Sequence, residues 1–163
     1  MLIRDAVESE FDEIGELTVR AYANLPNLEL RDDYRGVLMN VARRAQSNRV
    51  LVAEDEGVLV GTVTFVSDPT SEEAEFDDPD AAGIRMLAVD VAYQGRGIGR
   101  ALTEACVMAA RTAGRQRVIL FTLDAMVVAQ SLYRSLGFVR DTRRDWEPVP
   151  DVSLIGYAIE LAD

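Results

Sequence analysis

The sequence predicts a single α/β domain, and three observations support this prediction. Strand-length apolar segments alternate along the chain with segments whose apolar residues recur at helical spacing. A glycine-rich segment, residues 93–100, stands between one such strand and one such helix. The length of 163 residues suits one hydrophobic core and leaves no room for a second comparable one. The domain is therefore expected to span residues 1–163.

The first third of the chain is predicted to form one strand and two helices. Residues 2–7 are an apolar segment of strand length. Residues 8–24 are expected to form a helix that ends before Pro26, and residues 32–47 a second one. Both segments repeat apolar residues at helical spacing. The repeating residues are Phe11, Ile14, Leu17 and Ala21 in the first helix and Tyr34, Val37, Leu38, Val41 and Ala45 in the second.

A β-hairpin is predicted next. Residues 50–54 form an apolar strand, and residues 58–66 form a longer one. Residues 55–57, which read Asp-Glu-Gly, supply a turn of the composition that is typical of hairpins. The two strands are therefore expected to pair antiparallel.

The glycine-rich segment joins a further strand to a helix. Residues 84–89 are an apolar run of strand length. After the glycines, apolar residues recur on one face of a helix, which indicates that the helix begins directly after the loop. These residues are Ile98, Ala101, Leu102, Ala105, Cys106 and Ala109.

This loop has the features of a phosphate-binding site. Gly95, Gly97 and Gly99 let the backbone turn tightly and approach a ligand closely, because no Cβ stands in the way. The unpaired N–H groups and the dipole of the following helix favour a phosphate at its N-terminus. Arg96 and Arg100 can add positive charge there.

Other classes of glycine-rich loop fit this segment less well. The segment lacks the Gly-Lys-Ser/Thr ending of a nucleotide-binding P-loop. Gly95, Gly97 and Ala101 keep the spacing of a dinucleotide fingerprint, in which alanine is allowed at the third place. A dinucleotide domain begins with this strand-loop-helix unit and repeats it. Here the unit lies past the middle of the chain and no second one follows, so the surrounding elements disfavour a dinucleotide site.

The remaining segments are predicted to form a strand, a helix and a final strand pair. Residues 118–123 form an apolar strand, and residues 126–135 form a helix. Residues 138–144 and 154–161 are expected to pair antiparallel. The complete order of elements is β-α-α-β-β-β-α-β-α-β-β, without an internal repeat.

Two motifs resemble the GNAT superfamily of N-acetyltransferases. Residues 94–99, which read Gln-Gly-Arg-Gly-Ile-Gly, are similar to the family's Gln/Arg-x-x-Gly-x-Gly/Ala loop for coenzyme A. Residues 132–138, which read Leu-Tyr-Arg-Ser-Leu-Gly-Phe, are similar to its Leu-Tyr-x-x-x-Gly-Phe element. The motifs occur in the family's order and at about its spacing. The resemblance extends over the whole chain and implies a single-domain GNAT-like α/β fold, with a central mixed, mostly antiparallel sheet flanked by helices.

The resemblance also implies that acetyl-CoA is a co-substrate. Its pantetheine arm is expected to pair with the backbone of Leu87, Ala88 and Val89 as if it were another strand. A backbone N–H near Leu87 would then polarise the acetyl carbonyl. The residues expected to bind the pyrophosphate are Gln94, Gly95, Arg96, Gly97, Ile98, Gly99 and Arg100.

The resemblance implies that Tyr133 is the general acid that protonates the coenzyme A thiolate. The alternative is a semi-buried helix aromatic whose hydroxyl faces solvent. One departure from the family pattern lies seven residues earlier, where Met126 replaces a common asparagine that contacts the pantetheine arm. The general base stays open, and the candidates are a chain of water, Glu54, Glu75, Asp124 and Glu147.

Two classes of function are compatible with these residues. The first is an N-acetyltransferase that transfers the acetyl group to a primary amine by direct attack in a ternary complex. Its acceptor would be a cationic small molecule or a protein amino group. The second is an acyl-CoA-binding sensor or regulatory module without turnover. Tyr133 favours the enzyme, whereas Met126 favours the module.

Two loops are predicted between these elements, and each has a structural and a functional interpretation. Residues 67–82 contain seven acidic residues and two prolines. They form either a solvated connection or an electrostatic funnel for a cationic amine. Residues 146–151 begin with Trp146 and Glu147, whose aromatic face and carboxylate both suit an ammonium group. The alternative is that Trp146 packs against the sheet.

Charge and composition exclude several classes of protein. The chain has 17 basic and 28 acidic residues, a net charge of −11, which repels nucleic acid and anionic membranes. It has no histidine, which excludes a Ser-His-Asp or Cys-His nucleophile and His-ligated zinc, and no metal site is expected. Cys106 is the lone cysteine, so no intramolecular disulfide can form, and its place on the apolar helix face predicts a packed thiol.

The sequence contains no apolar run of membrane-spanning length. Its N-terminus does not read as a basic start followed by an apolar signal core. A cytoplasmic protein without membrane or nucleic-acid partners is therefore expected, and a homodimer stays open beside a monomer.

Overall fold

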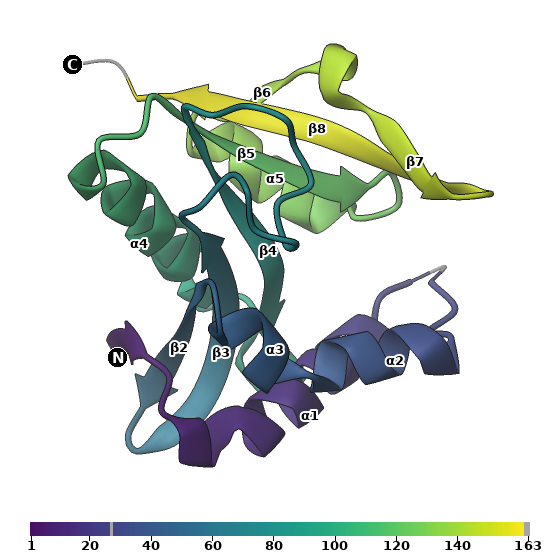
Figure 1. Ribbon diagram of the computed structural model, residues 1–163. Coiled ribbons are helices and arrows are strands. Elements are labelled where there is room, and N and C mark those ends of the chain that lie inside the picture. Colours follow the sequence, from purple (N-terminus) through teal and green to yellow (C-terminus); the bar gives the residue numbers. More distant parts are fainter. Residues whose placement is uncertain (27, 162–163) are drawn as a thin grey trace.

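The computed structural model describes residues 1–26 and 28–161, and in this part of the chain eight strands form one sheet (Figure 1). The strand order is β1-β2-β3-β4-β5-β8-β6, and β7 also pairs with β8. Only β4 and β5 run parallel, so the sheet is mixed and mostly antiparallel, as predicted. The strands are β1 (Leu2–Asp5), β2 (Arg49–Asp55), β3 (Val58–Val66), β4 (Ala81–Val89), β5 (Arg117–Leu123), β6 (Val139–Arg140), β7 (Trp146–Val149) and β8 (Val152–Glu160).

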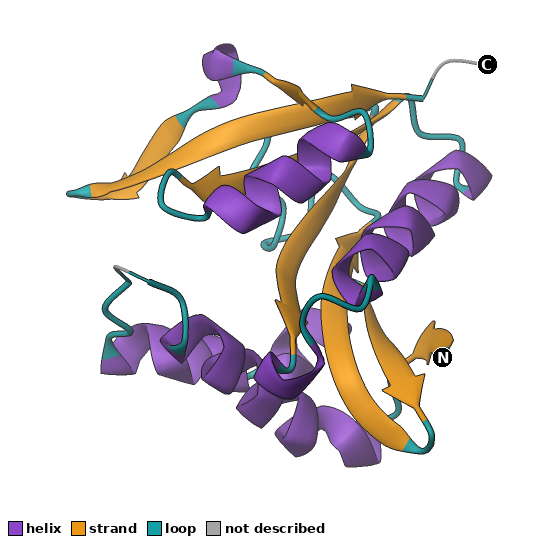
Figure 2. Cartoon of the chain, turned by 180° about the vertical axis from the view of Figure 1, so that it is seen from behind, coloured by secondary structure: helices purple, strands orange, loops and turns teal. Residues whose placement is uncertain are grey.

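Helices cover both faces of this sheet. Seen from behind, α4 lies in front of the β2–β3 half and α5 in front of the β5–β8 half (Figure 2). The first three helices pack on the opposite face. The helices are α1 (Phe11–Ala23), α2 (Asp32–Met39), α3 (Val41–Ala45), α4 (Ile98–Thr112) and α5 (Val127–Ser135), with short 3-10 turns at Glu8–Glu10, Val91–Tyr93 and Thr142–Arg144.

Strand β2 shows why its sequence is apolar at successive positions. Val50 and Val52 belong to the core that includes α1 and α3, whereas Leu51 and Ala53 belong to the core that includes α4. Neighbouring side chains point to opposite faces of a strand. Because helices cover both faces, every one of these positions is buried and no polar alternation is needed.

The structure corrects the prediction of one helix over residues 32–47. The helix is broken at Asn40 into α2 and α3. The Asn40 side chain accepts a hydrogen bond of 3.2 Å from the backbone N–H of Arg43 and so caps the start of α3. Asparagine favours such caps because its short side chain competes for nearby backbone groups. The apolar pattern continues across the break, which is why periodicity alone predicted a single helix.

The structure also corrects the prediction of a loop over residues 146–151. Trp146–Val149 form strand β7, which pairs with β8 as a hairpin. The turn includes Asp151 in a left-handed conformation, with φ of 69°. Pro148 and Pro150 indicated a loop, but β7 is a short outer strand, where proline is tolerated. The strand predicted over residues 138–144 is also shorter than expected, because only Val139–Arg140 form β6 and Thr142–Arg144 form a 3-10 turn. The other predicted elements lie within a few residues of their expected bounds.

Candidate functional site

The parallel strands β4 and β5 separate partway along their length. Within the described residues their pairing ends at Ile84↔Leu120, whereas β4 continues to Val89 and β5 to Leu123. Figure 1 shows the two strands diverging. The other edge of β4 is paired with β3 as far as Val89. The β5-facing edge of residues 85–89 can therefore accept an extended ligand, because its backbone N–H and C=O groups have no strand partner there.

A β-bulge lies where the strands separate. Between its pairs at Arg85 and Ala88, β4 has one residue more than β3. Met86, inside this interval, has φ of 53°, a conformation that costs a residue other than glycine roughly 1–3 kcal/mol. Bulges bend a strand and redirect its side chains, and they are frequent next to active sites. Of the predicted residues, Leu87 lies in the bulge beside Met86, and Ala88 and Val89 follow it.

The glycine loop directs the N-terminus of α4 to the end of this segment. Gly95 and Gly97 have φ of 81° and 80°, and a Cβ added at either one would meet no atom within 4 Å. Gly97 is the N-cap of α4, and the N–H of Ala101 makes the first helical bond to its carbonyl, at 3.0 Å. The N–H groups that precede Ala101 in the helix lack such partners and can bind an anion.

Gly99 does not serve the tight turn that was predicted for all three glycines. It lies within the first turn of α4 without a positive φ. A Cβ at Gly99 would lie 3.4 Å from Cδ2 of Leu132 on α5. Gly99 therefore allows α4 and α5 to pack closely, which brings together the two motifs found in the sequence.

The two arginines of the loop differ in their surroundings. The Arg96 guanidinium lies over the ring of Tyr93, 4.9 Å from its centroid, and has no carboxylate partner among the described residues. Arg100 pairs with Glu104 at 2.9 Å and donates a hydrogen bond to Ser135. Arg96 can therefore offer its charge to a ligand, whereas the charge of Arg100 is already partly neutralised.

Tyr133 is buried on α5, with only 6% of its surface exposed. Its ring packs against Phe138 and Tyr157, at centroid distances of 5.9 and 6.4 Å. The alternative of a hydroxyl in open solvent does not fit this burial. Desolvation raises the pKa of the Tyr133 phenol, so it stays protonated at neutral pH. Its hydroxyl has no hydrogen-bond partner in the described part of the chain, which leaves its proton free for a ligand.

Gln130 is a buried polar residue that the motifs did not identify. Its amide nitrogen donates to the carbonyls of Leu123 and Asp124, at 3.2 and 3.0 Å, and its oxygen accepts from the Tyr157 hydroxyl at 2.8 Å. These bonds attach α5 to the end of β5. Met126, at the place of the family's asparagine, is the N-cap of α5, and its sulfur accepts a bond from Thr122.

Arg85 is the charged residue at the start of the open segment. Its Nε lies 3.1 Å from Oε1 of Glu75, and its Nη1 lies 2.5 Å from Oε2 of Glu73. All three side chains are at most 20% exposed. A charge within an otherwise apolar strand was the sequence signal for this cluster. Burial raises the pKa of Glu75 above its ordinary value, and Arg85 offsets part of that rise.

Two tyrosines, Tyr22 and Tyr34, lie near the cluster of Arg85, Glu73 and Glu75. The rings of Tyr22 on α1 and Tyr34 on α2 lie 6.2 Å apart. Burial raises the pKa of Tyr22, and the nearby phenols of Tyr34 and Tyr133 raise it further, while the positive charge of Arg85 lowers it.

Of the four candidate bases, only Glu75 belongs to this cluster. Glu54 pairs with Arg4 at 2.9 Å on the β1–β2 side of the sheet. Glu147 accepts a hydrogen bond from the backbone N–H of Asp151 at the tip of the β7–β8 hairpin. Asp124 follows β5, at the start of the turn to α5.

Most carboxylates of the acidic loop are engaged by arginines. Glu72 pairs with Arg43, and Asp78 pairs with both Arg117 and Arg144. Together with the Arg85 pairs, these contacts hold in place a segment for which the sequence left two interpretations, a solvated connection or an electrostatic funnel. The loop is also anchored by Phe76, whose ring would lie 2.6 Å from a Cβ added at Gly83 of β4. The loop is thus packed against the sheet, and four of its seven acids are paired with arginines of the described residues.

Trp146 packs against the sheet, as one of the two expectations had it, and is also partly exposed. It stacks edge-on against Phe121 of β5, at a centroid distance of 6.3 Å, yet 41% of its surface is exposed. Figure 1 shows the β7–β8 hairpin projecting to the right of the view, above α2. Trp146 therefore packs on the sheet and still offers an aromatic face.

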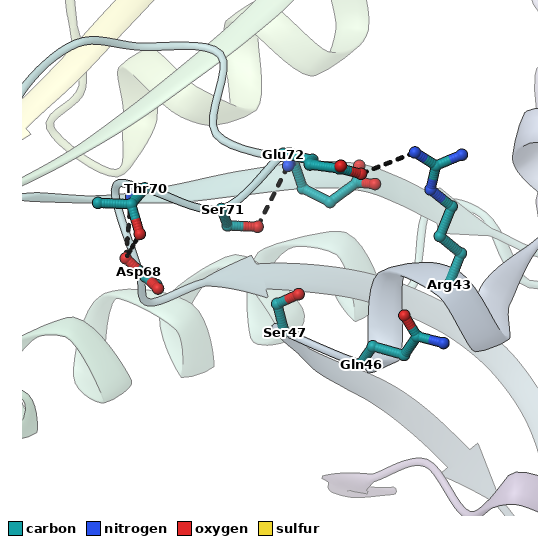
Figure 3. Close-up of a pocket in the computed structure, with 8 residues that line it drawn as sticks. Arg43, Gln46, Ser47, Asp68, Thr70, Ser71 and Glu72 are labelled. Atoms are coloured by element: carbon teal, nitrogen blue, oxygen red, sulfur yellow. Dashed lines mark hydrogen bonds and ion pairs between the residues drawn. The ribbon is translucent and has the colours of Figure 1, made fainter.

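Two cavities adjoin α3 and the acidic loop. The larger, about 330 Å³, is lined by Arg43, Gln46, Ser47 and residues of the segment 68–73, and includes the Arg43–Glu72 ion pair (Figure 3). The other, about 310 Å³, is lined by residues of α2 and α3 and by Arg85 and Met86 of β4. Only the second therefore reaches the bulge.

Cys106 lies on α4 and is fully buried in the core, and burial raises the pKa of its thiol to about 12. The prediction of a packed thiol is confirmed. In the described ranges no cluster of three or more metal-ligating side chains occurs. None of the described helices is both long and apolar enough to cross a membrane.

Comparison with known proteins places these features in a family. A sequence model of the Acetyltransferase (GNAT) family matches residues 3–138, which include the glycine loop and Tyr133. The chain is 38% identical to human N-acetyltransferase 8B over 115 residues, 68% of this chain and 48% of that protein. It is 33% identical to mycothiol acetyltransferase of Thermobispora bispora over 131 residues, 77% and 42% of the two chains. The chain thus spans somewhat less than half the length of these curated relatives.

Solved structures share the fold along nearly the whole chain. An acetyltransferase of the GNAT family from Staphylococcus aureus Mu50 superposes with a TM-score of 0.79 at 22% identity, covering 99% of both chains. A putative acetyltransferase from Salmonella typhimurium, solved with its cofactor acetyl-CoA, superposes with a TM-score of 0.70 at 22% identity, covering 100% of this chain and 95% of that one. With residues 3–138 matched by the family model and this fold throughout, the chain belongs to the GNAT family of acetyltransferases.

Proposed function

We propose that residues 1–163 act as one domain that transfers the acetyl group of acetyl-CoA to a primary amine, by direct attack in a ternary complex. The observation that carries this proposal is the open edge of β4 after Ile84, which leads to the glycine-capped N-terminus of α4. Acetyl-CoA matches this arrangement, because its peptide-like pantetheine arm can pair with the open strand edge and its pyrophosphate can lie at the N-terminus of α4. The names of the curated relatives, N-acetyltransferase 8B and mycothiol acetyltransferase, support acetyl transfer.

Backbone groups of Leu87, Ala88 and Val89 bind the amides of the pantetheine arm in this proposal. The N–H groups of residues 97–100 bind the pyrophosphate, with Arg96 adding charge and Gln94 at the edge of the loop. Gly95 and Gly97 are needed because their conformation and their lack of a Cβ leave the approach open. Gly99, Ile98 and Arg100 position the helix against α5 and the core.

Glu75 and Tyr133 carry the two proton transfers. The amine nitrogen attacks the thioester carbon, while a backbone N–H near Leu87 stabilises the oxyanion. Glu75 accepts the proton that the amine loses, directly or through one water. The C–S bond then breaks, and Tyr133 donates its proton to the departing thiolate. The products are the N-acetylated amine and coenzyme A, and the proton on Glu75 returns to Tyr133 through solvent.

The pKa directions suit these roles. A raised pKa makes the Glu75 carboxylate a stronger base than an ordinary glutamate. The Tyr133 phenol stays protonated until the reaction generates a thiolate beside it. No acetyl-enzyme intermediate is required, because the lone Cys106 is buried in the core and the chain has no histidine.

The test is to mix the protein with acetyl-CoA and a panel of primary amines and to follow release of the free thiol. The proposal expects amine-dependent release, matched by an equal amount of N-acetylated product. Acetyl-CoA binding without release in the presence of any amine would overturn the enzymatic proposal and favour an acyl-CoA-binding sensor or regulatory module.

A further inference from the structure

The cavity of about 310 Å³ beside the bulge has the position of an acceptor pocket. One wall is a single face of α2, where Asp33, Gly36, Val37 and Asn40 follow the spacing of neighbours on a helix. The opposite wall includes Met86, the residue directly before Leu87. The pocket therefore adjoins the position at which the proposed mechanism places the acetyl carbonyl.

Three arginines line this pocket, and their pairing differs. Arg43 pairs with Glu72, and Arg85 pairs with Glu73 and Glu75. Arg44 makes no ion pair with any described residue. The pocket also contains two carboxylates. Glu73 is held by Arg85, and Asp33 is exposed and lies 3.1 Å from Arg31.

Arg44 is a buried cation that has no carboxylate partner among the described residues. Only 2% of its surface is exposed. Its Nη1 donates one hydrogen bond of 3.0 Å to the carbonyl of Val37, while its buried Nε has no partner among the described residues. Burial lowers the pKa of Arg44, and the charge of Glu73 offsets part of this effect. Burying an unpaired charge is costly, so the site favours a bound anion.

We propose that Arg44 binds a carboxylate of the acceptor, so that the acceptor is an amine that also carries a carboxylate group, as an amino acid does. This inference rests on the proposed function. The planar guanidinium suits a carboxylate through paired N–H donors. A singly charged group fits better than a phosphate dianion, because Glu73 and Asp33 also line the pocket. Glu75, which pairs with the pocket residue Arg85 at 3.1 Å, accepts the proton of the amino group.

Gly36 leaves space for this ligand. It lies in the middle of α2, where glycine costs about 1 kcal/mol relative to alanine, and a Cβ added there would meet no atom within 4 Å. A larger side chain at Gly36 would therefore narrow the pocket while leaving the Arg44 residue itself unchanged.

The binding test uses N-acetyl products, which need no catalysis. N-acetylated alanine, phenylalanine and lysine are titrated calorimetrically, each as the free acid and as the primary amide. The wild type should bind at least one acid more tightly than its amide. Arg44→Met should weaken binding of that acid about 10- to 100-fold, the range for a hydrogen bond to a charged group, and leave the amide unchanged.

Arg43→Met is the matched control. It removes an arginine from the same pocket, but one that is exposed and paired with Glu72, so its effect should stay within about fivefold. Gly36→Leu keeps Arg44 and should also weaken binding of the acid, so a misfolded Arg44→Met would not prevent the test. Circular dichroism melting checks each variant.

Equal binding of acids and amides by the wild type, or an Arg44→Met loss no larger than that of Arg43→Met, would overturn the carboxylate site. If amines are acetylated equally well with and without a carboxylate, this inference fails while the proposed function stands. If the acids bind through Arg44 but no amine is acetylated, the proposed function fails and the carboxylate site stands.

Discussion

The Nε of Arg85 lies 3.1 Å from Oε1 of Glu75, and this contact connects the acidic loop to β4 directly before its bulge. Side-chain exposure is 20% for Arg85 and 18% for Glu75, so solvent screens the pair only weakly. A loop carboxylate is thereby held by a sheet residue, next to the strand segment proposed to bind the thioester. This is the rigid support that a base needs if it is to act on a bound amine.

Replacing Glu75 by glutamine should remove the general base. We expect kcat to fall roughly 10²- to 10⁴-fold, the usual range for loss of such a group, with acetyl-CoA binding unchanged. A base acts in its deprotonated form, so the wild-type kcat should decline as the pH falls through the raised pKa of Glu75, and this decline should be absent in the variant. Steady-state rates across a pH series measure both effects.

Glu72→Gln is the control for the Glu75 variant. Glu72 lies in the same loop, but its side chain is 77% exposed and pairs only with Arg43. Its kcat and pH profile should match those of the wild type. If Glu75→Gln keeps the wild-type kcat under conditions in which chemistry limits the rate, Glu75 is not the base.

Changes at Arg85 should shift the pH profile in a defined direction. Burial raises the pKa of Glu75, and the positive charge of Arg85 lowers it. Arg85→Gln removes that charge, so the acid limb of kcat should move to higher pH. Arg85→Lys keeps the charge and should leave the limb near its wild-type position. A limb that moves to lower pH in Arg85→Gln, or equally far in both variants, would contradict this coupling.

Tyr133→Phe should remove the proton donor and leave the packing of the ring intact. We expect kcat to fall roughly 10²- to 10⁴-fold while calorimetry shows acetyl-CoA binding close to that of the wild type. Tyr157→Phe serves as the comparison, since it removes a neighbouring hydroxyl that bonds Gln130 and Arg134. That variant should lose about 1 kcal/mol of stability and keep its kcat. A wild-type kcat in Tyr133→Phe would exclude Tyr133 as the acid.

Gly97→Asp should abolish coenzyme A binding, because it adds a side chain and a negative charge where the pyrophosphate is proposed to lie. Gly114→Asp places the same residue at the other end of α4, at a glycine with a similar φ of 74°. Both variants carry similar backbone strain, so a difference between them reports on the ligand. Calorimetric titration should show binding lost only for Gly97→Asp. Equal affinity in two folded variants would rule out the loop as the binding site.

The parts of this protein that could be predicted from sequence are those encoded by neighbouring residues. Periodicity identified most strands and helices, and the two contiguous motifs identified the glycine loop and Tyr133. The break at Asn40 was missed because the apolar pattern continues across it. Strand β7 was missed because Pro148 and Pro150 suggest a loop, while the outer position that tolerates them is a property of the sheet.

The acceptor side depends on contacts between distant residues. Nothing in the sequence indicates that Arg85 forms ion pairs with the acidic loop. The same acids were equally compatible with a solvated connection or an electrostatic funnel. Arg44 lies in a short helix among other charged residues, and only the packing of α2 and β4 shows that it is buried. Burial determines which pKa values shift and which charges stay unpaired, and these properties distinguish a binding site from ordinary surface. Identifying the acceptor side therefore requires the folded structure.

The central claim is direct transfer of acetyl from coenzyme A to an amine at the open edge of β4. The most direct measurement is a single turnover with ¹³C-labelled acetyl-CoA, an accepted amine and an excess of protein, followed by mass spectrometry of protein and product. The account predicts that all transferred label appears on the amine nitrogen, that the protein gains none, and that Tyr133→Phe slows the transfer. Label on the protein, or label released as acetate at a rate independent of the amine, would contradict it.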